Sequence, residues 1–150
     1  MNAQQLAAWM HDEHVKVREL SDHLSALTLD VPHEEFESWS DEIRARFEHF
    51  RAHLYQHMAL EENGGYLTPV IEMRPTLAAD VERLRRDHQQ MAEIMDTIHA
   101  ALNDLNPQHR RSARECCYRI ESLLSYVQHH ERNENLLVTY VFTQDIGDHD

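Results

Sequence analysis

The sequence predicts an all-α protein that folds as an up-down-up-down antiparallel four-helix bundle. Apolar residues recur at alternating steps of three and four in four segments, which is the periodicity of helices buried on one face. No segment shows the pattern of a strand, and 3 glycines and 4 prolines are too few for the many turns of an all-β protein. A chain of 150 residues fits one domain, and short connections favour antiparallel neighbours.

The first two helices follow from this periodicity. The first is expected over roughly residues 3–28, with a buried face made of Leu6, Met10, His14, Val17, Ser21 and Leu24. Residues 30–32 end it, and Pro32 is expected in the first turn of the second helix, where no backbone N–H is needed. The buried face of the second helix consists of Trp39, Ile43, Phe47, Phe50, Leu54, His57 and Glu61.

The third and fourth helices complete the bundle. Gly64 and Gly65 are expected to loosen or bend the chain, and residues 73–75 to separate the second helix from the third. The third helix has the most regular buried face, which consists of Leu77, Val81, Leu84, His88, Met91, Met95, Ile98 and Leu102. Asn106 and Pro107 are expected to supply the cap and first turn of the fourth helix. Its buried face consists of Ala113, Cys116, Ile120, Leu123, Val127, His130, Glu134, Leu137 and Val141. The bundle is thus expected over residues 1–142, followed by a polar, frayed tail over residues 143–150.

Charge and composition exclude several function classes. Lys and Arg number 14 against 27 Asp and Glu, and the net charge of −13 disfavours nucleic acid or an anionic membrane surface as partner. The sequence holds no glycine-rich phosphate loop, no secretory signal and no apolar run near the ~18 residues of a membrane span. Cys116 and Cys117 are adjacent and cannot frame a disulfide scaffold. We expect a cytoplasmic monomer or homodimer.

The two halves of the chain repeat one pattern of polar residues. An acidic residue followed by histidine occurs in the first and third helices, and a His-x-x-x-Glu motif occurs in the second and fourth. The repeated elements are Glu13-His14 and Asp87-His88, and His57…Glu61 and His130…Glu134. Such a duplication predicts a bundle with a pseudo-twofold axis. A third His-x-x-x-Glu match, His33…Glu37, is interpreted as chance.

Six polar residues share the buried faces with the apolar ones, and they are predicted to bind metal. They are His14, His57, Glu61, His88, His130 and Glu134. A carboxylate in a bundle core costs several kcal/mol unless it is paired. Histidine and glutamate four residues apart point the same way from one helix, so both can reach one ion or a close pair of ions. A hydrogen-bonded network without metal is the alternative.

The donor types narrow the choice of metal. Six ligands without sulfur do not fit a closed structural zinc site, whereas mixed imidazole and carboxylate ligands are typical of iron or manganese. Two octahedral ions would be served by four histidines, two bridging carboxylates and an oxo or hydroxo bridge, with positions left open for a small ligand. The Glu-x-x-His motif of ferritin-like sites and the HExxH motif of metalloproteases are both absent.

In this order and spacing, the motifs resemble the hemerythrin-like (HHE cation-binding) family over nearly the whole chain. The resemblance implies a hemerythrin-like bundle around two non-heme iron ions (Fe2+/Fe3+) that react with O2, NO or peroxide. It implies terminal ligands at His14, His57, His88 and His130, and bridging carboxylates at Glu61 and Glu134. The fifth histidine of the oxygen carriers is missing, because Leu84 and Ala92 flank His88 at four residues. This favours redox turnover or other ligands over reversible oxygen carriage.

Several neighbouring residues have open roles. The oxygen carriers have a histidine five residues before the last carboxylate, which is His129 here, but His130 is preferred because it lies on the buried face. His53 is expected on the flank, with a role as ligand left open. Glu13 and Asp87 either orient a ligand imidazole or lie in solvent, and Tyr126 either lines a pocket or packs.

The function expected is sensing, storage or detoxification of a small oxidant by a di-iron centre. A di-iron enzyme with peroxidase or nitric-oxide-reducing turnover is the alternative at the same centre. A histidine phosphotransfer bundle would need an exposed histidine near a basic residue and no convergent carboxylates. A plain acidic interaction module would tolerate alanine at all six positions.

Overall fold

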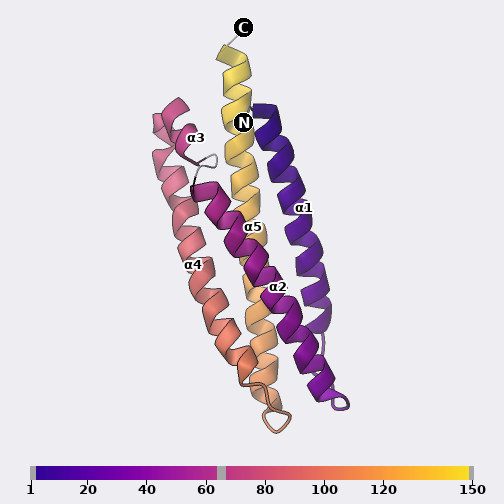
Figure 1. Ribbon diagram of the computed structural model, residues 1–150. Coiled ribbons are helices and arrows are strands. Elements are labelled where there is room, and N and C mark those ends of the chain that lie inside the picture. Colours follow the sequence, from indigo (N-terminus) through magenta and orange to yellow (C-terminus); the bar gives the residue numbers. More distant parts are fainter. Residues whose placement is uncertain (1–2, 64–66, 149–150) are drawn as a thin grey trace.

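The computed structural model describes residues 3–63 and 67–148, and over these ranges its regular secondary structure is entirely helical. Four long helices form the bundle: α1 (Ala3–Leu27), α2 (Phe36–Glu62), α4 (Ala78–Asn103) and α5 (Arg110–Asp148). A short helix α3 (Leu67–Met73) and a 3-10 turn η1 (Pro75–Leu77) lie between α2 and α4. Figure 1 shows the long helices running alternately down and up. The predicted all-α, up-down-up-down bundle is confirmed.

Each long helix packs against two others. Helix α1 contacts α2 and α5, and α4 contacts the same two helices from the other side. The four buried faces therefore point to one axis. The largest fully buried side chains there include Phe47, Phe50, Met91 and Ile120.

Both prolines expected in first helical turns lie outside the helices. Helix α2 begins at Phe36, and the loop before it is held by Arg110, whose guanidinium donates to the Pro32 carbonyl at 2.7 Å and to that of Val31. Helix α5 begins at Arg110, because Asn106 caps a separate turn by accepting from the Gln108 amide at 2.8 Å. Tertiary contacts and a local turn thus delay both helix starts.

The segment between α2 and α4 and the end of α5 differ from expectation. Helix α3 was not predicted, and it buries Leu67 and Val70 at one end of the bundle. The tail expected to fray from residue 143 continues α5 as helix through Asp148. The bend expected at Gly64 and Gly65, and residues 149–150, lie outside the described residues.

Buried apolar residues form two clusters rather than one. The larger cluster contains most of the core of the four long helices, including Val17, Leu54, Met91 and Val127. The smaller cluster lies at the end covered by α3 and contains Met10, Leu67, Val70, Val81, Leu84, Leu137, Val138 and Val141. Between the two clusters the core is polar.

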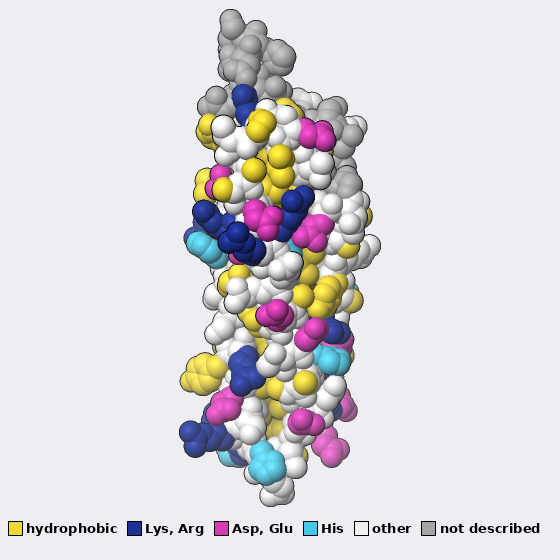
Figure 2. Space-filling view, turned by 90° about the vertical axis from the view of Figure 1, so that its left-hand side faces the viewer, with side chains coloured by type: hydrophobic (Ala, Val, Ile, Leu, Met, Phe, Trp, Pro, Cys, Tyr) yellow, Lys and Arg dark blue, Asp and Glu magenta, His cyan; other side chains and the backbone are white. Residues whose placement is uncertain are grey.

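The outer surface is charged. Figure 2 looks at the side of the bundle on which α3 and α4 lie, and basic and acidic side chains alternate there with small apolar areas. Neighbouring turns of α4 bring Arg85 and Arg86 each to 4.0 Å from Glu82. Such exposed pairs contribute little to stability, so the bundle depends on its core.

Candidate metal centre

The polar layer between the two apolar clusters contains all six residues that were predicted to bind metal. Their exposed fractions range from 0 % for Glu61 and Glu134 to 9 % for His14. Helix register places them there: Met10 and Val17, which flank His14 by one turn on either side, belong to the smaller and larger clusters respectively. The structure thus brings together side chains from α1, α2, α4 and α5.

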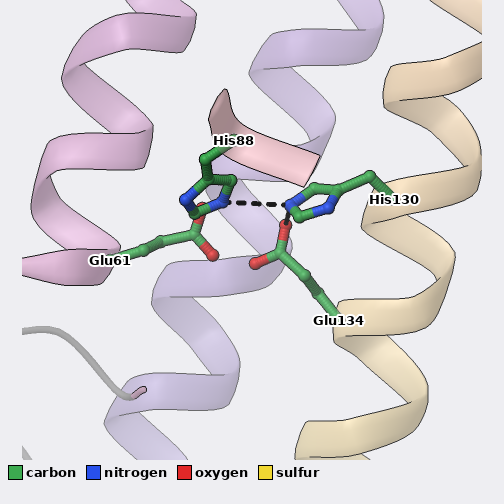
Figure 3. A group of neighbouring side chains, drawn as sticks. All are labelled: Glu61, His88, His130 and Glu134. Carbon is green, nitrogen blue, oxygen red and sulfur yellow. Dashed lines mark hydrogen bonds and ion pairs between the residues drawn. The ribbon is translucent and has the colours of Figure 1, made fainter. Parts of the chain in front are cut away.

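One group of possible ligands joins α2, α4 and α5. Glu61, His88, His130 and Glu134 each offer one ligand atom, and these atoms lie within 4.8 Å of one another. Figure 3 shows the two imidazoles facing each other, with their Nε2 atoms 3.1 Å apart. The Nε2 of His130 lies 2.7 Å from Glu134 Oε1, and that of His88 lies 3.4 Å from Glu61 Oε1. All four possible metal-ligand atoms therefore surround one small space in the core.

A second group includes α1 and shares one carboxylate with the first. His14, His57 and Glu134 also place ligand atoms within 4.8 Å of one another. His57 Nε2 lies 2.9 Å from Glu61 Oε1, and His14 Nε2 lies 4.0 Å from Glu134 Oε1. Each carboxylate therefore lies between histidines of different helices.

Carboxylates lie beside the outer nitrogens of three of the histidines and form hydrogen bonds with two of them, His57 and His130. His57 Nδ1 is 3.1 Å from Glu13 Oε2, and His130 Nδ1 is 2.9 Å from Asp87 Oδ2. His88 Nδ1 lies 3.3 Å from Glu62 Oε1. A carboxylate on one ring nitrogen fixes the tautomer and makes the other nitrogen a better metal ligand. In His57 and His130 this other nitrogen is Nε2, which faces the centre, and the Nε2 of His88 faces it too although its Nδ1 makes no hydrogen bond to the described residues.

The inner atoms lack the partners that buried polar groups require. Neither ring nitrogen of His14 makes a hydrogen bond to the described residues, and the same is true of Oε2 of Glu61, while its Oε1 has only the imidazoles of His57 and His88 beside it. Buried polar groups are nearly always satisfied in folded proteins. The unsatisfied atoms face inward and are imidazole nitrogens and carboxylate oxygens, so the residues present fit a bound cation.

Burial and neighbouring charges shift the pKa values at this centre. Burial, helped by His57, lowers the pKa of His14 to about 4. Burial alone would raise the pKa of Glu61, but the imidazoles of His57 and His88 outweigh it and bring this pKa to about 2. At neutral pH Glu61 is therefore an anion and His14 is neutral, which are the states in which both bind metal.

The structure shows where the residues lie whose roles the sequence left undecided. His129 is exposed, whereas only 3 % of the surface of His130 is exposed, so the preferred histidine, His130, faces the centre. His53 contacts Glu13 through Nε2 at 3.3 Å rather than the inner carboxylates. Glu13 and Asp87 both take the orienting position, and the chance match His33 is exposed. Cys116 is packed in the larger apolar cluster.

Three residues near the centre were not predicted to act there. The ring of Trp9 stacks on His57 with 5.5 Å between centroids, although Trp9 lies one position off the buried face of α1. Glu62 follows a predicted ligand directly, and this adjacency was the available signal. Glu131 has one buried oxygen without a hydrogen bond, and burial raises its pKa to about 8. No spacing rule identifies Glu131.

The orienting role of Asp87 predicts the effect of neutralising it. Asp87→Asn is expected to weaken metal binding about 10- to 100-fold, because removing a carboxylate that is hydrogen-bonded to a ligand histidine typically lowers metal affinity by this factor. Competition with a chelator of known affinity measures the change. The matched control is Asp96→Asn on the same helix, since Asp96 also accepts from a tyrosine but contacts no histidine of the centre. Equal affinities in the two variants would contradict the assigned role.

The lowered pKa of His14 predicts how the metal-free protein responds to acid. Between pH 6.5 and about pH 4, an unfolded His14 is protonated while the folded one is not, so the contribution of His14 to stability falls as pH drops through this window. The loss is at most about 3 kcal/mol, from 1.36 kcal/mol per unit of pKa. His57 adds no slope there, because its raised pKa keeps it protonated in both states.

Urea unfolding in the presence of a chelator, repeated from neutral pH to about pH 4, measures this slope. His14→Gln keeps a polar side chain that does not titrate, and its slope is expected to be smaller. Identical slopes for the two proteins would show that His14 is protonated in the folded state as easily as in the unfolded one.

Comparison with known proteins places the chain in a family. The family model of the hemerythrin HHE cation-binding domain matches residues 5–141, which covers all six residues of the polar layer. No curated protein and no solved structure matches the sequence. Within the described part of the chain, none of the helices is long and apolar enough to cross a membrane. With the match spanning most of the sequence and a His/Glu cluster able to hold a metal ion in the core, the chain belongs to the hemerythrin HHE cation-binding domain family.

Proposed function

We propose that this protein binds two non-heme iron ions and reacts with a small oxidant: O2, NO or peroxide. One observation carries the proposal. Imidazole Nε2 atoms and carboxylates from all four long helices converge in the core, while carboxylates form hydrogen bonds with the outer nitrogens of His57 and His130. A purely structural network would satisfy its inner atoms, but both ring nitrogens of His14 and Oε2 of Glu61 are left without hydrogen bonds among the described residues.

One feature supports a pair of ions, and a second supports iron as the metal. The two groups of possible ligands overlap at Glu134, and a carboxylate with two oxygens can serve two ions. The donors are nitrogen and oxygen only, which suits iron, whereas structural zinc sites commonly use thiolates. Burial in the larger cluster raises the pKa of Cys116 to about 11, so it offers no thiolate.

The chain itself has three tasks at such a centre. The histidines and carboxylates hold the ions, and the outer carboxylates fix the histidine tautomers. The apolar clusters on both sides keep bulk water out, and neither position four residues from His88 has the fifth histidine of an oxygen carrier, since these positions are Leu84 and Ala92. Iron, when bound, supplies reversible one-electron chemistry and affinity for O2, NO or peroxide. A centre with fewer protein ligands favours reaction over storage of intact O2.

The test is to produce the protein in iron-supplied cells and to measure metal content together with the optical spectrum. We expect about two irons per chain, the number that two sets of ligands can serve, and absorption typical of a bridged diferric pair. Mixing the reduced protein with O2, NO and peroxide in a stopped-flow instrument then identifies the reactive oxidant. Binding of zinc alone, or an iron-loaded protein inert to all three, would contradict the proposal.

A further inference from the structure

The two halves of the centre differ at one pair of equivalent positions. One turn before the histidine of each His-x-x-x-Glu motif, α2 has His53 and α5 has Tyr126. Both contact the carboxylate that orients that histidine. His53 Nε2 lies 3.3 Å from Glu13 Oε2, and the Tyr126 hydroxyl donates to Asp87 Oδ1 at 3.0 Å. The repeat therefore places an imidazole on one side and a phenol on the other.

The phenol belongs to a continuous chain of hydrogen bonds that leads to the centre. Asp87 accepts from Tyr126 with Oδ1 and from the Nδ1–H of His130 with Oδ2, at 3.0 and 2.9 Å. The Nε2 of His130 faces the other ligands. Only two residues thus separate the phenol oxygen from the position of a metal ion.

Tyr126 is also the outermost member of this chain. His130 is 3 % exposed, but the tyrosine ring is half-buried and lines a groove of about 660 Å³ between α4 and α5, together with Ile94, Thr97 and Leu123. A reductant in solvent can reach the ring without entering the core. Burial and Asp87 together raise the pKa of Tyr126 to about 12, so the phenol is protonated at rest.

We propose that Tyr126 donates one electron to the metal centre when hydrogen peroxide reacts there, and is left as a neutral tyrosyl radical. The inference rests on the proposed di-iron function. Hydrogen peroxide is reduced to two molecules of water, and this reduction takes up two electrons and two protons. The two protons come from solvent. One electron comes from the remaining ferrous ion of a half-oxidised pair, and the other comes from Tyr126. The O–H bond of Tyr126 breaks, and its proton passes to Asp87 Oδ1.

Two other aromatic residues allow the proposal to be tested against alternatives. Tyr55 has a similar bond, from its hydroxyl to Asp96 Oδ1 at 3.0 Å, but Asp96 is exposed and pairs with Arg51 instead of a ligand histidine. Trp9 reaches His57 by stacking of its ring, whereas Tyr126 donates its hydroxyl directly to the carboxylate of Asp87. Oxidation of a phenol at neutral pH requires a proton acceptor, and Asp87 supplies one.

The experiment uses the iron-loaded full chain, brought to the half-oxidised state and mixed with hydrogen peroxide. Samples frozen at increasing times are examined by electron paramagnetic resonance. We expect the signal of the half-oxidised pair to disappear and a radical signal to appear. The linewidth of this radical signal should be narrower in protein whose tyrosine rings are deuterated. The radical is expected to be lost in Tyr126→Phe and retained in Tyr55→Phe. It is also expected in a variant in which Tyr55, Tyr66, Tyr118 and Tyr140 are all phenylalanine.

The outcomes separate this inference from the function on which it rests. If iron binds and peroxide oxidises it, but no radical forms or the radical persists in Tyr126→Phe, the inference is wrong and the proposed function stands. A signal narrowed by deuterated tryptophan and lost in Trp9→Phe would assign the electron donor to Trp9 instead. A wild-type protein that takes up no iron overturns both. If Tyr126→Phe loses iron, the variant with Tyr126 as its single tyrosine decides the question.

Discussion

Replacing His130 with alanine is expected to remove the bound metal, whereas replacing its neighbour His129 is expected to leave it in place. The His130 ring lies between Asp87 and Glu134 and is 3 % exposed, while His129 lies on the surface of the same helix. Loss of a direct ligand should weaken metal binding by more than the ~10- to 100-fold that is expected when a carboxylate orienting a ligand is removed. Stability should fall as well, because the free energy of metal binding contributes to folding.

Metal analysis after gel filtration and thermal unfolding with and without chelator measure both effects. In His130→Ala the chelator should no longer lower the unfolding temperature, and in His129→Ala it should lower it as in the wild type. Full metal content in His130→Ala would show that this histidine is not a ligand. Loss of metal in both variants would point to a general effect on α5.

His14→Leu is expected to change stability in opposite directions with and without metal. In the metal-free protein both ring nitrogens of His14 are buried without hydrogen bonds to the described residues, and each such group costs about 1–3 kcal/mol. Leucine fills similar space without that cost, so the metal-free variant should be more stable than the wild type. In the presence of metal the order should reverse, because one ligand has been lost.

Urea unfolding of both proteins, with chelator and with saturating ferrous ion under anaerobic conditions, gives the four free energies. The change of sign distinguishes a residue kept for binding from one kept for packing. Met10→Leu, one turn earlier on α1 and 2 % exposed, is the control and should show no such reversal. A variant that is less stable under both conditions would mean that His14 contributes to packing of the metal-free core.

The sequence was sufficient to predict the bundle and the side chains of its polar layer, for one physical reason. A histidine or glutamate on the apolar face of a helix must be buried when the helix packs, and His88 follows this rule as Leu84 and Met91 do. Features that do not depend on the apolar face of a long helix were not predicted. The start of α2 depends on Arg110, which is distant in sequence, and α3 is too short for its periodicity to be read.

The outer shell of the centre could be predicted only in part. Glu13 and Asp87 were candidates because each precedes a histidine predicted to bind metal, but each contacts the histidine of a different helix, which only the packing of the helices decides. The burial of Glu131 likewise depends on how closely α1 approaches α5, and no pattern along one helix records this distance.

The division of the apolar core into two clusters has a consequence for how the molecule opens. The small cluster under α3 is separated from the larger one by the layer of charged and polar side chains, so few apolar contacts join the two clusters. Without an ion, the α3 end can therefore fray while the rest of the bundle stays folded, as happens where few apolar contacts cross a boundary. An ion held by all four long helices would couple both ends into one cooperative unit, so that amide hydrogens around Leu67 and Val81 exchange slowly only in the loaded protein.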